Sequence, residues 1–336
     1  MGYRHIINVV DSHTAGDPLR LVLSGLPAIR GKTMKEKIDY LNEKFPHLLG
    51  IIMQEPRGHR EMFGAILVEP LAEEADFGLI FTDTTNYYYG MCGHGTIAAA
   101  TIVAEMGMVE YCEPVTEITF ETGAGLVKTL VEIKDHEAVH VTIKNVPSFL
   151  YKTGIEIDLL EIGSLSVDIS YGGGFFILVP VEQLGVKIET DQVRLLHSYA
   201  VNIREAVEKK TRIYYPAKPE ASEEVDVFFY QKVEGEKKTY KILEILATSN
   251  QLSRSPCGTG TSALMAMLYG KGDLELQEEI KTQSFIGTEF LSRLVGEVDE
   301  GQYRAVIPQI TASAYITGFN QLVVKNRDPL GLGFIF

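Results

Sequence analysis

The chain has 336 residues, enough for two domains that each bury a hydrophobic core. Hydrophobic residues make up 45% of it and charged residues 23%, as in soluble globular proteins. The formal net charge of -14 argues against a surface that binds DNA, RNA or an anionic membrane. A local group of backbone N–H donors can still hold a small anion, so an anionic small-molecule substrate stays open.

Targeting and membrane segments are not expected. The stretch MGYRHIINVVDSHTAGD carries charges at Arg4 and Asp11 and lacks an apolar core of signal-peptide length. A run of about 20 apolar residues, as a membrane-spanning helix needs, is not present in the sequence. Three cysteines without close pairing do not form a disulfide framework, so we expect a reduced, cytoplasmic protein.

Five strand-like runs are predicted, each rich in β-branched and aromatic residues and bounded by turn formers. Two of them precede the motif CGHGT at Cys92–Thr96, and three precede the motif CGTGT at Cys257–Thr261. After each motif, a helix-like segment leads to another strand region that contains a glycine, Gly123 in the first case and Gly287 in the second. In chain order, the runs are Phe63–Pro70, Phe77–Asp83, Phe175–Val181, Val225–Val233 and Tyr240–Thr248.

The helix-like segments after the two motifs lack a charged face. No residue carries a charge from Thr96 to Ala104 or from Ser255 to Gly270. A surface helix has a polar face, so each segment is predicted to be a helix buried on all sides. Its first N–H groups lie where glycine and threonine leave them accessible to a ligand. Because about half of the chain separates the motifs, we interpret them as two diverged copies of one α/β unit.

Each cysteine is predicted at a helix N-terminus, where the helix dipole favours the thiolate and lowers the pKa of the thiol. The flanking glycines let a substrate approach the backbone, and the N–H groups suit a carboxylate. If the two domains face each other across a cleft, the two sulfurs lie on opposite faces of the carbon next to that carboxylate. One thiolate then removes the α-proton and the opposite thiol delivers a proton to the other face, while the N–H groups stabilise the enolate-like intermediate.

Other interpretations of the cysteines are weaker. A free cysteine is commonly a small core residue, and Cys112 in VEYCEPV is assigned to that class. A metal site is not expected, because only His94 follows at ligand spacing and Thr259 replaces it in the second motif. An acyl-transfer nucleophile needs one cysteine and a histidine base rather than two symmetric cysteines. A redox disulfide between Cys92 and Cys257 stays open.

Several segments together resemble the proline racemase family, which also contains 4-hydroxyproline epimerases and trans-3-hydroxy-L-proline dehydratases. They are MCGHGTIAAAT, SRSPCGTGTSA, DSHTAGDPLR, EPRGHREMFGA, NVPSFLYK, YGGGFF and SAYITGFNQ, and they span essentially the whole chain. The resemblance implies an α/β (α+β) homodimer without cofactor or metal, as in the superfamily of diaminopimelate epimerase. Two pseudo-symmetric domains, 1–147 plus 320–336 and 148–319, each form a curved mixed β-sheet or barrel around a buried central helix.

The resemblance also assigns roles to individual residues. Cys92 and Cys257 match the two acid/base thiols. Tyr171 opens the loop expected to line the ring pocket, although a packing role is equally open. The positions whose backbone N–H groups hold the substrate carboxylate are Gly93, His94, Gly258 and Thr259, of which His94 also lies near the substrate ring or caps nearby backbone.

One residue departs from the family pattern. The family usually has Asp four residues before the second cysteine, where it contacts the substrate amine, and this chain has Ser253. A hydroxyl accepts a hydrogen bond from an ammonium group but brings no charge. We therefore expect Ser253 to bind the amine more weakly or to change the range of substrates.

The second cysteine separates the candidate activities. In the family that the chain resembles, the dehydratases carry Thr in its place, because elimination of water needs a base on one face only, so Cys257 favours racemisation or epimerisation. The segment YGGGFF and the lack of tryptophan favour proline racemase over 4-hydroxyproline 2-epimerase. Alternatives are that epimerase, a broader amino-acid racemase, the dehydratase, and a non-catalytic amino-acid-binding or redox protein. The substrate range and the thiol deprotonated with each enantiomer stay open.

Overall fold

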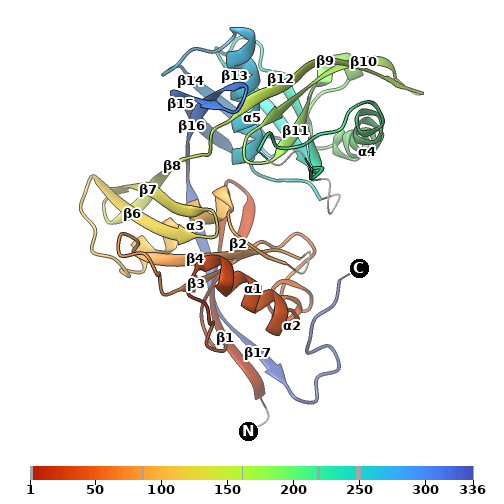
Figure 1. Ribbon diagram of the computed structural model, residues 1–336. Helices are drawn as coiled ribbons and strands as arrows, with labels where there is room; N and C mark the ends of the chain where they lie inside the picture. Colours follow the sequence, from red (N-terminus) through yellow and green to blue (C-terminus); the bar gives the residue numbers. More distant parts are fainter. Residues whose placement is uncertain (1–2, 85–86, 161, 218–219, 247–250, 336) are drawn as a thin grey trace. The chain divides into compact units, whose positions relative to one another are not determined.

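The computed structural model describes residues 3–84, 87–160, 162–217, 220–246 and 251–335 (Figure 1). The chain divides into two compact units, unit 1 from Met1–Ile143 with Ala312–Phe336, and unit 2 from Lys144–Thr311. The return to unit 1 begins at Ala312, earlier than the residue 320 expected from the sequence. It does so because β17 (Ala314–Lys325) is one continuous strand that pairs with β1 (Tyr3–Thr14) along its length.

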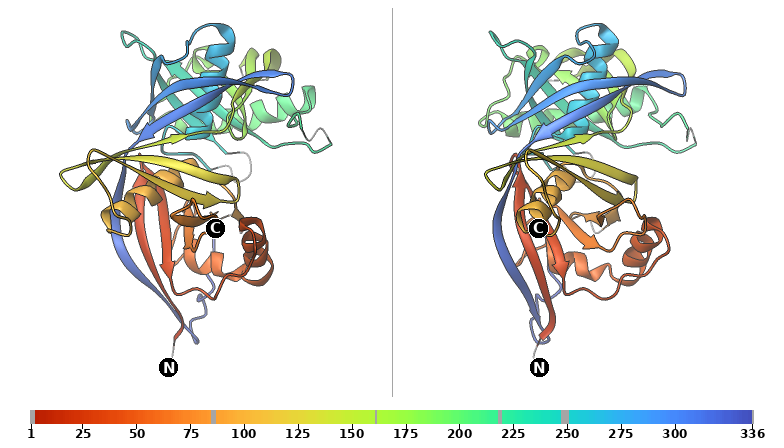
Figure 2. Two further views of the ribbon diagram at one scale, coloured as in Figure 1. Left: turned by 60° about the vertical axis from the view of Figure 1, so that its left-hand side comes forward. Right: turned by 90° about the vertical axis from the view of Figure 1, so that its left-hand side faces the viewer.

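Unit 1 is a mixed sheet with one helix inside and two helices outside. In Figure 2, the long antiparallel pair of β1 in red and β17 in blue lies side by side in both views. The two outer helices are α1 (Met34–Lys44) and α2 (His47–Met53). The remaining elements are β2 (Asp17–Ser24), β3 (Gly64–Val68), β4 (Phe77–Thr82), β5 (Tyr88–Tyr89), α3 (Gly93–Glu105), β6 (Val115–Thr122), β7 (Gly125–Lys134) and β8 (Glu137–Lys144).

Unit 2 repeats this construction. Its inner helix is α5 (Gly258–Lys271) and its outer helix is α4 (Val193–Lys210), preceded by the 3-10 turn η1 (Val181–Leu184). The strands are β9 (Phe149–Leu159), β10 (Gly163–Tyr171), β11 (Phe175–Pro180), β12 (Val225–Lys232), β13 (Thr239–Ile245), β14 (Glu279–Ser284), β15 (Glu289–Glu300) and β16 (Tyr303–Ala312). The five predicted strand runs match β3, β4, β11, β12 and β13; residues 247 and 248 of the last run lie outside the described residues.

The strands of unit 1 and the strands of unit 2 follow the same order of directions. In unit 1 the order is β17-β1-β2-β3-β4-β6-β7-β8, with parallel pairing only for β2–β3 and β4–β6 among these neighbours. In unit 2 the order is β9-β10-β11-β12-β13-β14-β15-β16, with parallel pairing only for β11–β12 and β13–β14. The parallel pairs fall at the same two places, so the predicted pseudo-symmetric α/β fold is confirmed.

Each sheet curves around its inner helix. The helix α3 contacts β17, β1, β2 and β3 towards one end of its sheet and β7 towards the other, and α5 contacts β9, β10 and β11 as well as β15. Every residue from Gly95 to Ala104 is buried, as is every residue from Gly260 to Leu268. The lack of charged side chains in these helices is therefore explained by burial on all sides, as the sequence predicted.

The outer helices α1 and α4 each bury one face, and α1 also has a side-chain cap. Thr33 caps α1 by accepting a hydrogen bond from the N–H of Glu36, whose carboxylate accepts from the N–H of Lys32. In α4, the buried positions Leu196, Ala200 and Ile203 recur at helical spacing on one face. Among the described residues, no helix has the length and apolar character needed to cross a membrane.

Candidate functional site

Cys92 is the N-cap residue of α3. It has an extended backbone, with φ -148° and ψ 118°, and its side chain makes no capping hydrogen bond. Its carbonyl accepts hydrogen bonds from both the N–H and the hydroxyl of Thr96, at 2.9 Å and 2.8 Å, which fixes the first turn of the helix. The Sγ atom is therefore held at the end of the helix where N–H groups lack intrahelical acceptors.

Two side chains contact the Cys92 sulfur. The Nδ1 atom of His94 lies 3.4 Å from Sγ. The imidazole itself is fixed by an edge-to-face contact with Phe63, and the carbonyl of His94 accepts a hydrogen bond from the Thr14 hydroxyl. The second contact is a side-chain hydrogen bond between Tyr89 and Cys92.

Cys257 is the N-cap residue of α5 and is buried. Its Sγ atom accepts a hydrogen bond from the N–H of Gly260 at 3.1 Å and lies 3.3 Å from the hydroxyl of Thr259. The backbone of Cys257 has φ 53° and ψ 111°, a conformation that strains a residue with a side chain. Because strained backbone persists only where the surroundings hold it, the structure fixes this sulfur closely.

Burial raises the pKa of the Cys257 thiol well above its ordinary value, and the carboxylate of Glu244 raises it further, while Thr259 and Gly260 act in the opposite direction. The prediction that a helix N-terminus lowers the pKa of this cysteine is therefore wrong for Cys257. A charge in a buried site loses its hydration, and the hydrogen bonds from Thr259 and Gly260 do not offset that cost together with a neighbouring carboxylate.

The second glycine of each motif is required by packing. A Cβ atom at Gly95 would lie 2.9 Å from the ring of Phe81, and one at Gly260 would lie 2.3 Å from the ring of Phe228. The first glycines differ, because a Cβ at Gly258 would meet nothing within 4 Å. A Cβ at Gly93 would meet only the Ile143 methyl at 3.6 Å. In the first turn of each helix, the second glycine of the motif thus packs on an aromatic ring, and the first glycine borders open space.

The segment before α5 brings Ser253 close to the second motif. Ser253 is buried, and its N–H donates to the carbonyl of Glu244 at 3.2 Å. Its hydroxyl lies 3.4 Å from the carbonyl oxygen of Ser255. The predicted residues Ser253, Cys257, Gly258 and Thr259 therefore gather at one end of α5.

Tyr171 lies in an aromatic cluster of unit 2. Its ring centroid is 5.2 Å from that of Phe149, 5.1 Å from Phe175 and 5.0 Å from Tyr215. The glycines that follow Tyr171 approach α5 instead, since a Cβ at Gly172 would lie 2.1 Å from the carbonyl oxygen of Thr259. The loop thus contacts the second motif through its backbone, while the Tyr171 ring packs with other aromatic rings.

Two groups at the motifs were missed in the sequence. Glu244 and Tyr89 each form a side-chain hydrogen bond with one of the motif cysteines. A signal for Glu244 was available, because it is the single carboxylate inside the apolar run YKILEILAT. The prediction for Cys112 is also wrong: it is exposed rather than a core residue, because it lies in the connection between α3 and β6.

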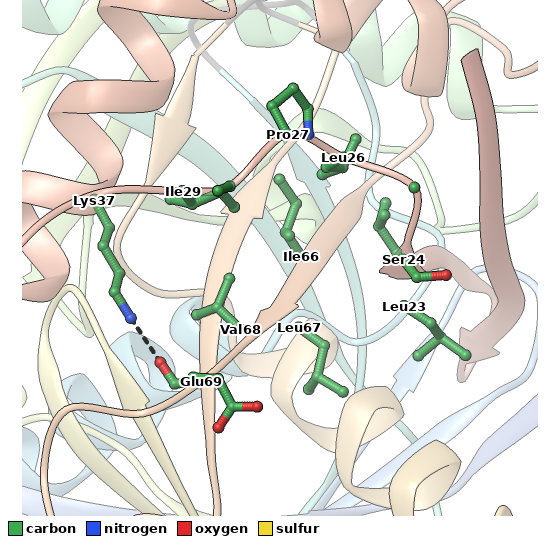
Figure 3. Close-up of a pocket in the computed structure, with 13 residues that line it drawn as sticks. Leu23, Ser24, Leu26, Pro27, Ile29, Lys37, Ile66, Leu67, Val68 and Glu69 are labelled. Carbon is green, nitrogen blue, oxygen red and sulfur yellow. Dashed lines mark hydrogen bonds between the residues drawn. The ribbon is translucent and has the colours of Figure 1, made fainter.

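A separate cavity lies in unit 1, away from Cys92. Its volume is about 390 Å³, and it is lined by β2, β3, the chain after β2 and the buried Lys37 (Figure 3). The Nζ atom of Lys37 donates to the carbonyl oxygen of Glu69 at 2.6 Å. Burial lowers the pKa of Lys37, against the opposing effects of Glu121 and Glu69. None of the predicted site residues lines this cavity.

Comparison with known proteins gives the class of the molecule. The chain is 43% identical to the proline racemase of Clostridioides difficile over 335 residues, covering 100% of this chain and 99% of that one. It is 36% identical to the 4-hydroxyproline 2-epimerase of Streptosporangium roseum, covering 100% of both chains. The crystal structure of a hydroxyproline epimerase from Agrobacterium vitis with bound trans-4-hydroxy-L-proline superposes with a TM-score of 0.87 at 29% identity, covering 100% of this chain and 97% of that one.

These likenesses define an isomerase of the racemase and epimerase type. The family model described as proline racemase matches residues 9–335. The chain belongs to the proline racemase family.

Proposed function

We propose that the protein is a cofactor-independent proline racemase that interconverts L- and D-proline. The observation that carries the proposal is the equivalent placement of two cysteines, each as the N-cap of a buried helix in one of two units with the same strand order. The 43% identity to a proline racemase over the full length supports the same activity.

We assign the two proton transfers to Cys92 and Cys257. Inversion at a carbon needs one group that removes the proton and a second group that returns a proton to the opposite face. The thiolate of one cysteine takes the Cα proton, and the electron pair remains on Cα and its carboxylate. The thiol of the other cysteine then donates its proton to Cα, so each turnover exchanges the protonation states of the two sulfurs.

The substrate carboxylate is assigned to the first turns of α3 and α5. The N–H groups of Gly93, His94, Gly258 and Thr259 are early donors of these helices, and the space beside Gly258 is open. Donors aimed at a carboxylate that becomes enolate-like stabilise the transition state more than the ground state. A Cβ-free position next to them lets the carboxylate approach the backbone.

A second candidate activity is 4-hydroxyproline 2-epimerisation. It is favoured by the 36% identity to a 4-hydroxyproline 2-epimerase and by the solved epimerase with bound trans-4-hydroxy-L-proline. Ser253 lies next to the second motif and offers an uncharged hydroxyl, which we propose widens the range of accepted ring amino acids.

One panel of substrates tests the proposal. The purified enzyme is incubated with L-proline, trans-4-hydroxy-L-proline and trans-3-hydroxy-L-proline, and the products are separated on a chiral column. Formation of D-proline as the fastest reaction supports the racemase. Faster inversion of the 4-hydroxy substrate supports the epimerase instead. Loss of water from the 3-hydroxy substrate without any inversion would contradict both.

We further propose a cytoplasmic homodimer, as the family resemblance implies. Light scattering coupled to gel filtration measures the mass directly, and a mass of twice 37.3 kDa is expected. A single-chain mass at working concentration would contradict the dimer.

A further inference from the structure

Each motif cysteine has a neighbouring side chain at an equivalent place in its unit, but the two side chains are of different chemical types. In unit 2, the ring of Phe228 packs on Gly260 at the start of α5, and Phe228 is paired across the antiparallel strands with Glu244. Residues paired in this way project from the same face of a sheet. Glu244 therefore projects towards the first turn of α5, where its side chain hydrogen-bonds Cys257.

Unit 1 has the same arrangement with a different side chain. The ring of Phe81 packs on Gly95 at the start of α3, and Phe81 is paired across the antiparallel strands with Tyr89. The rings of Phe81 and Tyr89 stack with centroids 6.3 Å apart. Tyr89 hydrogen-bonds Cys92, so a phenol occupies the place that a carboxyl group occupies beside Cys257.

We propose that this exchange of phenol for carboxyl divides the roles of the two sulfurs: Glu244 keeps Cys257 as the thiol in the resting enzyme, and Cys92 is the sulfur that takes the first proton from the substrate. The inference rests on the proposed function for its catalytic meaning. Tyr89 and Glu244 are positioning residues in it, because each acts through a cysteine. Neither has been assigned a role by the family motifs.

The chemistry of the two neighbours explains the direction. Burial, followed by the charges of Cys92 and Asp83, raises the pKa of Tyr89 well above its ordinary value, so Tyr89 remains a neutral phenol that donates its proton in a hydrogen bond. A hydrogen bond donated to the charged form of a group favours that form. Glu244 is 6% exposed, and its carboxylate accepts the hydrogen of the Cys257 thiol while repelling a thiolate.

Side chains and backbone groups from several elements act on the two sulfurs. For Cys257, the groups among the described residues include the carboxylate of Glu244 from β13, the neutral Thr259 hydroxyl and the Gly260 N–H. For Cys92 the titratable contacts are His94 from α3 and Tyr89 from β5, with Asp83 acting on Tyr89.

The proposal determines which enantiomer the resting enzyme deprotonates. The enantiomer whose Cα–H faces Cys92 gives its proton to the Cys92 sulfur, and the electron pair stays on Cα and the carboxylate. The Cys257 thiol then protonates the opposite face and becomes a thiolate beside Glu244. This product form of the enzyme is the less stable one, so it returns to the resting form by exchange of protons with water.

Site-resolved alkylation tests the proposal without any substrate. Iodoacetamide reacts with thiolates, and mass spectrometry of the digested protein gives separate rates for Cys92, Cys257 and the exposed Cys112 across a range of pH. In the wild type, Cys92 reacts faster than Cys257 near neutral pH. Glu244→Gln shifts the Cys257 profile to lower pH and raises its rate about tenfold near neutrality, since one pKa unit corresponds to a factor of ten.

Two further variants separate charge from packing. Glu244→Asp keeps the charge and leaves the Cys257 profile closer to the wild type than to Glu244→Gln. Tyr89→Phe removes the donor and lowers the rate at Cys92 severalfold near neutral pH, while Cys257 is unchanged. The rate at Cys112 is the internal control and stays constant throughout. Unchanged Cys257 profiles in Glu244→Gln, or equal shifts in the Gln and Asp variants, would overturn the proposal.

The alkylation rates and the activity assay can reject this inference and the proposed function separately. If the wild type does not invert proline but Glu244→Gln activates Cys257, the proposed function is wrong and the assigned protonation states stand. If proline is inverted and the alkylation profiles do not respond, the proposed function stands and this inference is wrong.

Discussion

The backbone N–H of Gly260 donates a 3.1 Å hydrogen bond to the Sγ atom of Cys257. Cys92, the equivalent N-cap residue in unit 1, makes no such bond, and its Sγ atom lies beside the imidazole of His94. Two copies of one structural unit therefore place a thiol at the same point while surrounding it differently. The proposed transfer of protons on opposite faces of Cα would use this combination of similar position and different surroundings.

Replacement of either thiol tests its role in proton transfer. Cys92→Ser and Cys257→Ser each lower the rate of proline inversion by about 10²–10⁴-fold, because a serine hydroxyl does not ionise near neutral pH. The matched control is Cys112→Ser, which changes an exposed cysteine outside the motifs and leaves the rate at its wild-type value. Near-normal turnover in either motif variant would contradict the two-thiol mechanism.

The two glycines of the second motif have separable roles. Gly260→Ala costs about 1–3 kcal/mol of unfolding free energy, because the added Cβ would lie 2.3 Å from the Phe228 ring. Gly258→Ala leaves stability unchanged or improves it by up to about 1 kcal/mol, since its Cβ meets nothing within 4 Å and alanine favours a helix.

Gly258→Ala is expected to lower activity even though it does not lower stability. The Cβ of Gly258→Ala enters the space assigned to the substrate carboxylate, so kcat/KM falls roughly 10–100-fold in a variant of normal stability. Urea unfolding and chiral assays measure the two effects. Full activity in Gly258→Ala would show that the carboxylate does not approach the backbone there.

Ser253 tests how the substrate amine is held. Ser253→Asp adds a carboxylate that pairs with an ammonium group, so we expect KM for L-proline to fall about tenfold and the range of accepted amino acids to narrow. Ser253→Asn is the matched control, since asparagine has nearly the shape of aspartate but carries no charge. An unchanged KM and an unchanged substrate range in Ser253→Asp would contradict the assignment.

The raised pKa of Cys257 predicts how stability depends on pH. Since the neutral thiol is favoured in the folded state, this group contributes stability that is full below the ordinary thiol pKa of 9.0 and is lost as pH rises above it. Between about pH 8 and 10, the unfolding free energy of the wild type therefore falls more steeply than that of Cys257→Ser. Urea unfolding across this range checks the difference, and parallel curves would contradict it.

The sequence predicted the buried helices and the strands beside them, because composition alone revealed them. A helix without a charged residue between Thr96 and Ala104 has to be buried, and the repeated CGxGT motif marked its N-terminus. The match of strand directions between the units could not be predicted from the sequence. It depends on β17, which comes last in the chain and fills the place in unit 1 that β9 fills in unit 2.

The side chains beside the two thiols could not be predicted either, because their placement depends on how strands pair. Glu244 reaches Cys257 through pairing of β12 with β13, and Tyr89 reaches Cys92 through the short strand β5. Such contacts depend on strand register, which a single sequence does not specify. The pKa of Cys257 was predicted in the wrong direction because the helix dipole is visible in the sequence and the burial of the sulfur is not.

The central claim is inversion by two separate acid/base thiols, and isotope labelling tests it most directly. L-proline is incubated with the enzyme in D2O, and both enantiomers are isolated early in the reaction for mass spectrometry. The account predicts one deuterium at Cα of the D-proline formed and none in the remaining L-proline, because the donating thiol has exchanged with solvent. Deuterium in both enantiomers at equal rates would mean that one base serves both faces, and no deuterium in either would mean that Cα is not deprotonated.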